Sequence, residues 1–572
     1  MSGPVEALSD RVLFGMLSES PDLAMTLGIA AVAGKPLPRE RLPDFSEDGD
    51  ERRRSLVRGW AKDLSKIPAN GESLDESLTR RVLGYVLERG FYGCFSGLAG
   101  HESAAQLEPL THLRGVHEVA MSMLVRDAVL HSAEDRECWV ERLSRLPAAL
   151  EAAARTLRSR RKQRLAAPWA VLERAHEDIR GTLEAEVPRN VFRETLKRGL
   201  PEPGDVRAQR LLETTDDLLR GPVRTAYATL LAELKEHLRI ADMAVSARRR
   251  PGGEAFYHWR LAGHTTSDLS AMSMHELALE ELQRLGEVLQ QELDTLGVVG
   301  SRTEALHAAA LQDAYPSGEE GRELALADAR RSVADAGERL RPLFNRWPSA
   351  DAVVSAYSRA DEASQHTSYV PSPQPGAPAT FRLNLAHASA GTRGECAVTA
   401  WHEVWPGHHL QLALALELPL PAFRRAMLFS GYLEGWAKYA EGLAASMLAA
   451  SPHTRIARLR MELYSTATLA LDTGIHAHGW SAEAAAEFFQ RETAAPDALA
   501  RMVVLRSAAD PGQLCAYKWG LLEMRRLRER FASLRGDAFR VQHFHDAVLG
   551  QGALPLTLLA TTLERQAAQQ AA

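Results

Sequence analysis

The sequence predicts a mainly α fold with a minor strand component, and three observations support this prediction. Segments rich in Ala, Leu, Glu and Arg recur along the chain, and their apolar residues return every three or four positions, which is typical of amphipathic helices. Runs in which apolar and polar residues alternate are scarce. The 572 residues are 45% hydrophobic and 25% charged, which is the composition of a folded chain that can build a large core.

The predicted helices, taken in chain order, cover both halves of the sequence. They span residues 137–165, 208–248, 274–297, 322–343, 456–471, 482–493 and 519–535. Ser273 and Glu276 have the spacing of a capping box, and Ser481 precedes an Ala-rich run, so we expect helices to begin at both serines. The best candidate strand lies at residues 379–385, where the sequence reads ATFRLNL.

A stretch dense in Pro and Ser, residues 368–380, is expected to be a loop with extended pieces. It separates a plain helical half from a half that holds nearly every unusual cluster of side chains. We therefore expect a helical N-terminal region over residues 1–250 and a helical region with the chemical motifs over residues 251–572. The two regions are expected to form one continuous structural unit.

Charge, hydropathy and cysteine usage exclude several classes of protein. Lys and Arg total 68 and Asp and Glu total 74, so the net charge is −6 with both signs interspersed, and nucleic acid is not an expected partner. No run approaches the roughly 18 to 20 apolar residues that cross a membrane. The four cysteines lie far apart, and the first residues do not resemble a secretory signal. We expect no membrane partner, no disulfide framework and a cytoplasmic location.

The segment at residues 401–411 reads WHEVWPGHHLQ and raises the question of a metal site. In an HExxH motif the two histidines lie four apart, about 6 Å along one helix face, so both can reach a zinc ion. Here the next histidines after His402 are His408 and His409, six and seven positions on. Seven residues of helix climb about 10.5 Å, whereas two nitrogens on one zinc ion lie at most about 4 Å apart. A regular helix therefore cannot bring either pair together.

Pro406 and Gly407 interrupt the helix between these histidines. Pro406 lacks the N–H that would bond to the carbonyl of His402, and Gly407 loosens the adjoining backbone. The helix break falls where a metal site needs one. We therefore interpret these histidines as zinc ligands and not as three unrelated imidazoles around a kink.

The third ligand is expected to be a carboxylate on a following helix. Glu434 lies 434 − 402 = 32 positions after His402, among apolar and aromatic residues where an unpaired carboxylate is costly. It could instead pair with Lys438, four positions on. Glu441, seven positions after Glu434, is a candidate acceptor behind a ligand imidazole.

Five motifs resemble, in the same order, those of the bacterial family of unknown function numbered 885. They are HEVWPGHHLQ, GYLEGWAKYAEGL, DTGIHAHGW, PGQLCAYKWG and FHDAVLGQGALPL, which span residues 402–556, and YHWRLAGHTT at residues 257–266 resembles an upstream portion. The family is similar to the gluzincin zinc peptidases, which include helical carboxypeptidases and the angiotensin-converting enzymes. The resemblance implies a large helical fold with a deep central cleft, in which two histidines and a downstream glutamate hold zinc.

The resemblance also bears on the second histidine ligand. His402 and Glu403 match the HE of the relatives directly, and the Gly-His that often follows in them matches Gly407 and His408. Matching His-x-Gln instead would select His409, so His408 is preferred and His409 is the alternative. The chain departs from the family pattern at Lys438, where relatives usually carry an apolar residue, and after Arg506, where they usually carry tyrosine.

Several further residues are assigned roles in hydrolysis of an amide bond. Glu403 is the expected general base, which accepts a proton from water and passes it to the leaving amine. Tyr517 and His476 are the expected donors to the developing oxyanion, with His478 as an alternative to His476. The residues expected to bind substrate are Lys518, Gln513, Arg506 and Asn384, with Tyr369 also near the cleft, and Asp472 is expected to orient His476.

These residues predict a zinc-dependent hydrolase of peptide or amide bonds in small peptides or a peptide-like metabolite. Two alternatives come from other classes. One is a non-catalytic protein that keeps the fold to bind a peptide or partner, and the other is a non-hydrolytic iron or manganese enzyme, because His and carboxylate ligands also suit iron. The sequence leaves the substrate, exo or endo cleavage and the oligomeric state open, with a homodimer among the alternatives.

Overall fold

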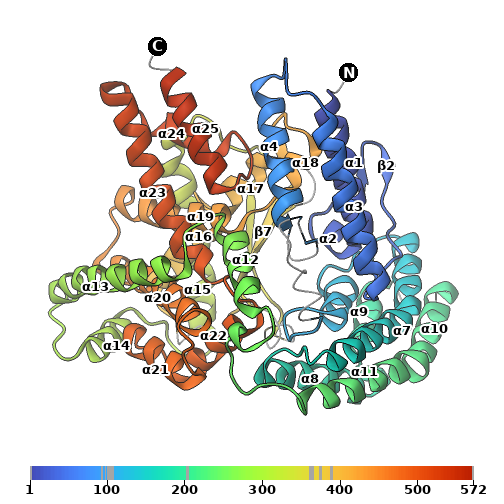
Figure 1. The fold of residues 1–572 in the computed structure, drawn as a ribbon. Helices are drawn as coiled ribbons and strands as arrows, with labels where there is room; N and C mark the ends of the chain where they lie inside the picture. Colours follow the sequence, from blue (N-terminus) through green and yellow to red (C-terminus); the bar gives the residue numbers. More distant parts are fainter. Residues whose placement is uncertain are drawn as a thin grey trace. The chain divides into compact units, whose positions relative to one another are not determined.

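The computed structural model describes residues 3–569 except residues 92–94, 97, 99–108, 201–204, 360–361, 363–365, 373–375 and 387–390. Helices account for 70% of the residues and strands for 4%, which confirms the predicted mainly α fold (Figure 1). Two compact units emerge from the backbone contacts. Unit 1 comprises Met1–Trp259, Pro421–Phe423 and Ala508–Asp510, and unit 2 comprises Arg260–Leu420, Arg424–Ser507 and Pro511–Ala572.

Unit 1 is built from helices and two short hairpins. Its elements are α1 (Pro4–Glu19), α2 (Pro21–Thr26), β1 (Ala31–Val32), β2 (Lys35–Pro36), α3 (Glu47–Lys66), α4 (Leu74–Arg89), β3 (Gly90–Phe91), β4 (Phe95–Ser96), α6 (Val116–Met121), α7 (Ala133–Lys162), α8 (Trp169–Glu184), α9 (Val191–Arg198), α10 (Val206–Arg220) and α11 (Pro222–Leu238). Helix α11 packs against α7 and α8, and their apolar faces form a buried core.

Unit 2 contains the remaining helices and a small sheet. Its elements are α13 (Ala271–Thr295), α14 (Arg302–Asp313), α15 (Glu319–Leu340), β5 (Ala352–Ala356), β6 (Ser368–Val370), β7 (Ala379–Leu383), α16 (Arg393–Glu403), α17 (His408–Glu417), α19 (Ser430–Met447), α20 (Pro452–His476), α21 (Ala482–Thr493), α23 (Cys515–Arg535), α24 (Val541–Leu549) and α25 (Leu556–Gln569). Three helices include residues of both units: α12 (Gly253–Thr265), α18 (Ala422–Ala426) and α22 (Asp497–Ala509).

The predicted helices are present, with bounds that differ in two instructive ways. The segment 208–248 contains two helices, α10 and α11, because Gly221 and Pro222 end one and begin the next. The serine that caps α13 is Ser270 and not Ser273, since the Ser270 side chain accepts from the Ser273 N–H. Ser481 caps α21 as predicted.

The sheet of unit 2 has the strand order β5-β7-β6. Strand β7 confirms the strand predicted at residues 379–385, and it pairs in parallel with β5 and antiparallel with β6. Strand β6 is the extended piece at the start of the predicted Pro- and Ser-rich loop. Strand β5 was missed, because AVVSA is short and does not alternate between apolar and polar residues.

Helices α19 and α23 cross at unusually short range, and this crossing positions the site. A Cβ atom on Gly435 of α19 would lie 2.6 Å from the Cα of Gly520 on α23. A Cβ atom on Gly520 would lie 2.2 Å from the carbonyl oxygen of Gly431. Only glycine fits at these points, so the two backbones touch and the residues beside them are brought together. Within the described ranges, no helix is both long enough and apolar enough to span a membrane.

Candidate metal centre

The predicted helix break separates His402 from His408. Helix α16 ends at Glu403, the chain turns through residues 404–407, and α17 begins at His408. The Trp405–Pro406 peptide bond in this turn is cis. A Cβ atom on Gly407 would lie 1.8 Å from the carbonyl oxygen of His402, so glycine is required for the turn to fold back on the end of α16.

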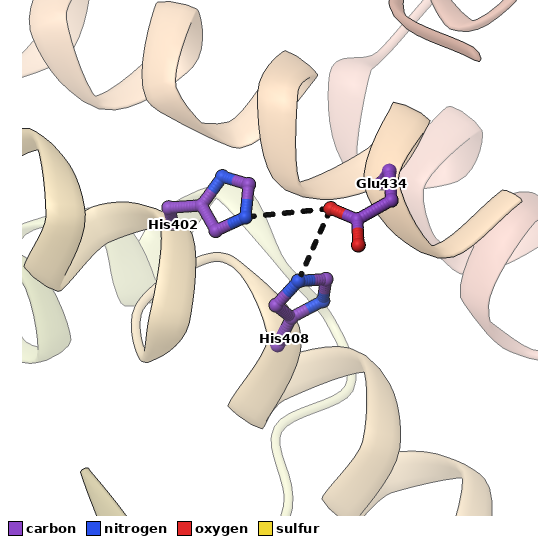
Figure 2. A group of neighbouring side chains, drawn as sticks. All are labelled: His402, His408 and Glu434. Carbon is purple, nitrogen blue, oxygen red and sulfur yellow. Dashed lines mark ion pairs between the residues drawn. The ribbon is translucent and has the colours of Figure 1, made fainter. Parts of the chain in front are cut away.

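His402, His408 and Glu434 come together, as the sequence predicts. The Nε2 atoms of His402 and His408 lie 3.5 and 3.6 Å from Oε2 of Glu434, and the two imidazole rings are nearly perpendicular at 87° (Figure 2). One ligand atom from each residue lies within 4.8 Å of the other two. The side chains are only 12%, 14% and 19% exposed, so this group is largely sheltered from solvent.

This arrangement fits a tetrahedral divalent cation such as zinc. Two ligands at about 2.1 Å from zinc and at a tetrahedral angle lie about 3.4 Å apart, close to both nitrogen–oxygen distances. Oε2 of Glu434 is buried and accepts no hydrogen bond, although it lies between two imidazole nitrogens. The two imidazole nitrogens are its ion-pair partners in this structure, and a cation held by all three groups would replace that pairing.

Glu441 lies behind the His402 ring, as predicted. The Nδ1–H of His402 donates to Oε1 of Glu441 at 2.8 Å, which leaves Nε2 directed at Glu434. Lys438 pairs with Glu441 at 2.9 Å, so it is not the partner of Glu434 that a helix-surface salt bridge would need. The sequence favours a ligand role for Glu434 over this salt bridge.

The carboxylates and imidazoles shift one another's pKa values. Burial alone would lower the pKa of His402, but Glu434 and Glu441 outweigh it and raise the pKa to about 10. Burial would likewise raise the pKa of the Glu434 carboxyl, but the two imidazoles lower it below its ordinary value. Glu434 is therefore ionised at neutral pH, as a metal ligand requires, whereas His402 would release a proton on binding a metal.

Trp436 was not predicted, and it ties the turn to α19. Its indole N–H donates to the carbonyl oxygen of Pro406 at 2.9 Å, and the side chain is fully buried. The indole thus fixes the turn beside the helix that carries Glu434. The sequence placed Trp436 two positions after Glu434, but it offered no signal for a partner 30 residues upstream.

Glu403 lies at the end of α16 and is partly exposed. Within the described part of the chain, no hydrogen bond or ion pair engages its carboxylate. Burial raises the pKa of Tyr369, and the charge of Glu403 raises it further, so the two side chains are close enough to interact electrostatically. The Tyr369 hydroxyl lies 3.0 Å from Nδ1 of His409.

Tyr517, Gln513 and Arg506 form a second polar group. The Arg506 guanidinium donates to Oε1 of Gln513 at 2.9 Å and to the Tyr517 hydroxyl at 3.3 Å. Burial and the negative charge of Glu434 raise the pKa of Tyr517 to about 12, so the phenol remains protonated. Tyr517 thus lies between the candidate metal ligands and an exposed arginine.

His409, the alternative ligand, is directed elsewhere. Its Nε2–H donates to the carbonyl oxygen of Ala350 at 3.0 Å, and its Nδ1 accepts from the Tyr369 hydroxyl. The ring is fully buried with both nitrogens occupied. His408 is therefore the histidine that joins His402 and Glu434, because the first turn of α17 directs successive residues to different sides.

Lys518 does not face the candidate centre, which corrects its predicted role in substrate binding. Its ammonium is fully buried and lies 2.8 Å from Glu281 and 2.9 Å from Glu462. Arg525 and Arg458 also bind Glu462. Lys518 is therefore part of a buried ion cluster, and its charge is neutralised there.

His476 and Asn384 are likewise engaged within the fold. His476 is fully buried, and its Nε2 lies 3.1 Å from the carbonyl oxygen of Ser507. The Asp472 carboxylate accepts hydrogen bonds from the Ser507 hydroxyl and from the Gly512 N–H, and these bonds stabilise the turn before α23. The Asn384 amide donates to the carbonyl oxygen of Glu362 and accepts from the Ala386 N–H, so both its ends are used locally.

Comparison with known proteins identifies relatives of the whole chain. The model of a family described as "Bacterial protein of unknown function (DUF885)" matches residues 21–563. The crystal structure of a candidate lipoprotein from Colwellia psychrerythraea is similar, with a TM-score of 0.91, 21% identity and 99% of each chain covered. A candidate lipoprotein of unknown function from Shewanella oneidensis is also similar, with a TM-score of 0.74, 16% identity, and 98% of this chain and 99% of that chain covered. At such identities the likeness concerns the fold. No curated protein matched the chain.

Proposed function

This chain belongs to the bacterial DUF885 family of proteins of unknown function, and from that premise we propose that it is a zinc-dependent hydrolase of peptide or amide bonds. One observation carries the proposal. Two imidazole nitrogens and one buried carboxylate oxygen converge at distances that suit a shared zinc ion. Such a site has three protein ligands, which is the number that catalytic zinc sites use.

His402, His408 and Glu434 would hold the metal, and Glu441 would keep the His402 ring turned toward it. When bound, zinc supplies Lewis acidity toward water and carbonyl oxygen. Glu403 adjoins His402 in sequence, and its carboxylate makes no hydrogen bond or ion pair within the described residues, so it is available to accept a proton from water. It then passes this proton to the nitrogen of the leaving amine.

Tyr517 and Arg506 would act on the substrate itself. The protonated phenol of Tyr517 can donate to a carbonyl oxygen as negative charge develops there. Arg506 is exposed beside it and suits a carboxylate, so it takes the role that the sequence gave to Lys518. This arrangement favours small peptides or peptide-like molecules with a free carboxylate near the scissile bond.

Metal content tests the proposal most directly. The purified full chain should hold about one zinc ion, measured by plasma mass spectrometry, and His402→Ala, His408→Ala and Glu434→Ala should lose it. His409→Ala is the matched control, because it removes the adjacent imidazole and should keep the metal. A chain that holds no zinc, or that keeps it in all three ligand variants, would contradict the proposal and favour a non-catalytic binding protein.

Glu403→Gln tests the assignment of the general base. The variant should keep zinc and lose hydrolysis by about 100- to 10,000-fold, because the amide cannot accept the proton. A screen of short peptides with either terminus blocked, in which cleavage is followed by mass spectrometry, would identify a substrate. Blocked C-termini should abolish cleavage, and Arg506→Met should raise KM only for peptides with a free carboxylate. Peptide cleavage that returns with iron or manganese and not with zinc would contradict zinc as the metal and leave the hydrolase assignment in place.

A further inference from the structure

Lys438 is a buried lysine on the helix that supplies the candidate metal ligand Glu434. Its side chain is 7% exposed, and its ammonium lies 2.9 Å from Oε1 of Glu441, three residues on. The ammonium also donates to the carbonyl oxygen of Met461 on α20 at 3.5 Å. Lys438 is thus held from two helices at the back of the candidate metal centre.

One oxygen of Glu441 joins Lys438 to a metal-ligating imidazole. Oε1 accepts from the Lys438 ammonium and also from the Nδ1–H of His402 at 2.8 Å. The opposite nitrogen of that ring, Nε2, faces Glu434 at 3.5 Å. A continuous chain of contacts therefore leads from the lysine, through the carboxylate and the imidazole, to the point where the ligands converge.

The burial of Glu441 explains why a cation is needed in this position. Its side chain is only 2% exposed, and a carboxylate so buried is costly when a neutral imidazole is its sole partner. The ammonium compensates the negative charge and holds the carboxylate on the side of His402. Among the described residues, no side chain other than His402 and Lys438 pairs with this carboxylate.

We propose that Lys438 is a positioning residue for the metal: through Glu441 it fixes the His402 ring with Nε2 directed at Glu434, and it thereby strengthens zinc binding. This inference rests on the proposed zinc site. It assigns Lys438 no contact with substrate or with the metal. Partners behind ligating histidines are worth about 10- to 100-fold in metal affinity, so an effect of this kind is measurable.

A double-mutant cycle on the full chain tests the inference, with zinc affinity measured by competition against a chromogenic chelator. Lys438→Met should weaken zinc binding by about tenfold, and Glu441→Gln by about 10- to 100-fold. The double variant should bind zinc as Glu441→Gln does, because Lys438 acts only through that carboxylate. Lys518→Met removes a fully buried ammonium from another ion cluster, and it should leave the zinc affinity unchanged.

Two results would overturn the inference. One is a Lys438→Met variant that binds zinc with the wild-type affinity. The other is an effect of Lys438→Met that persists undiminished in the Glu441→Gln background, which would make the lysine independent of the carboxylate. Lys438→Gln replaces Lys438→Met in the cycle if the latter does not fold. Failure of the zinc site itself is distinguishable, because the wild-type chain would then bind no zinc at all.

Discussion

Tyr517 and Lys518 are consecutive residues that lie in different surroundings. Tyr517 contacts Gln513 and Arg506, whereas the Lys518 ammonium is buried between Glu281 and Glu462. Successive residues of an α-helix point about 100° apart, so two neighbours cannot both face one site. The role of Lys518 follows from this geometry and is to hold α23 in place.

We expect Lys518→Met to destabilise the protein without weakening substrate binding. Removing one partner from a buried ion pair leaves the carboxylates uncompensated and costs about 3–5 kcal/mol. The free energy of unfolding in urea measures this loss. Arg284→Met is the matched control, because Arg284 belongs to the same cluster but is 48% exposed, so its loss should cost less than about 1 kcal/mol. Equal losses in the two variants would contradict the assignment.

The sequence predicts the residues of the centre better than their partners. The HE pair, the break at Pro406 and Gly407, and a buried acid among aromatic residues each carry a local chemical signal, and they identify His402, His408 and Glu434. The partners of His476, Asn384 and Lys518 come from distant segments, and nothing local in the sequence reveals them. The structure engages all three side chains in contacts within the fold.

At the scale of elements, the crossing of α19 and α23 brings Glu434 near Tyr517. Gly435 follows Glu434 directly, and Gly520 lies three residues after Tyr517, so contact between the two glycines brings these side chains to one place. Glycine inside a helix is unfavourable by about 1 kcal/mol relative to alanine. Its presence at this crossing is explained by the close approach, and a single sequence does not distinguish such a glycine from an ordinary one.

We expect Gly435→Ala to separate the two helices and weaken zinc binding by at least tenfold. The new methyl group would lie 2.6 Å from the Cα of Gly520, so the backbones must move apart and displace Glu434. Gly442→Ala on the same helix is the control, since a Cβ atom there meets nothing within 4 Å. It should be neutral or slightly stabilising. Chelator competition and thermal unfolding report the two effects, and equal zinc affinities would contradict the expectation.

At the scale of the whole molecule, buried neutral histidines govern the response to acid. Burial lowers the pKa of His112, His117, His275 and His545 to about 4 in each case. In the unfolded chain these histidines take up protons below about pH 6.5. Between about pH 6.5 and 4 the unfolded state therefore binds more protons than the folded state, and stability falls as the pH falls.

We expect the apparent Tm to decrease steadily from pH 6.5 to about 4 in the presence of a chelator, which removes any contribution from metal release. One such histidine contributes up to about 1.4 kcal/mol per pH unit. The slope should be smaller in His545→Gln than in the wild type. A Tm that is constant over this range would contradict the expected burial of these rings in their neutral form.

The fold class was predictable from helical periodicity, because apolar residues at steps of three and four persist through most of both units. The division of the predicted segment 208–248 at Gly221 and Pro222 was not predicted, although both residues disfavour a continuous helix. The pairing of β5 with β7 was not predicted either, since it joins residues 379 − 352 = 27 positions apart and only β7 shows alternation in its own sequence. The segments 421–423 and 508–510, which belong with unit 1, likewise carry no local signature of that membership.

Helix α19 places Glu434, Lys438 and Glu441 on one face by steps of four and three residues. An inserted or deleted residue between positions 434 and 441 would turn everything beyond it by about 100° and shift it by about 1.5 Å along the axis. Glu434 and Glu441 would then no longer contact the two nitrogens of the same ring, that of His402. Between positions 434 and 441, substitutions are therefore tolerated far more readily than insertions or deletions.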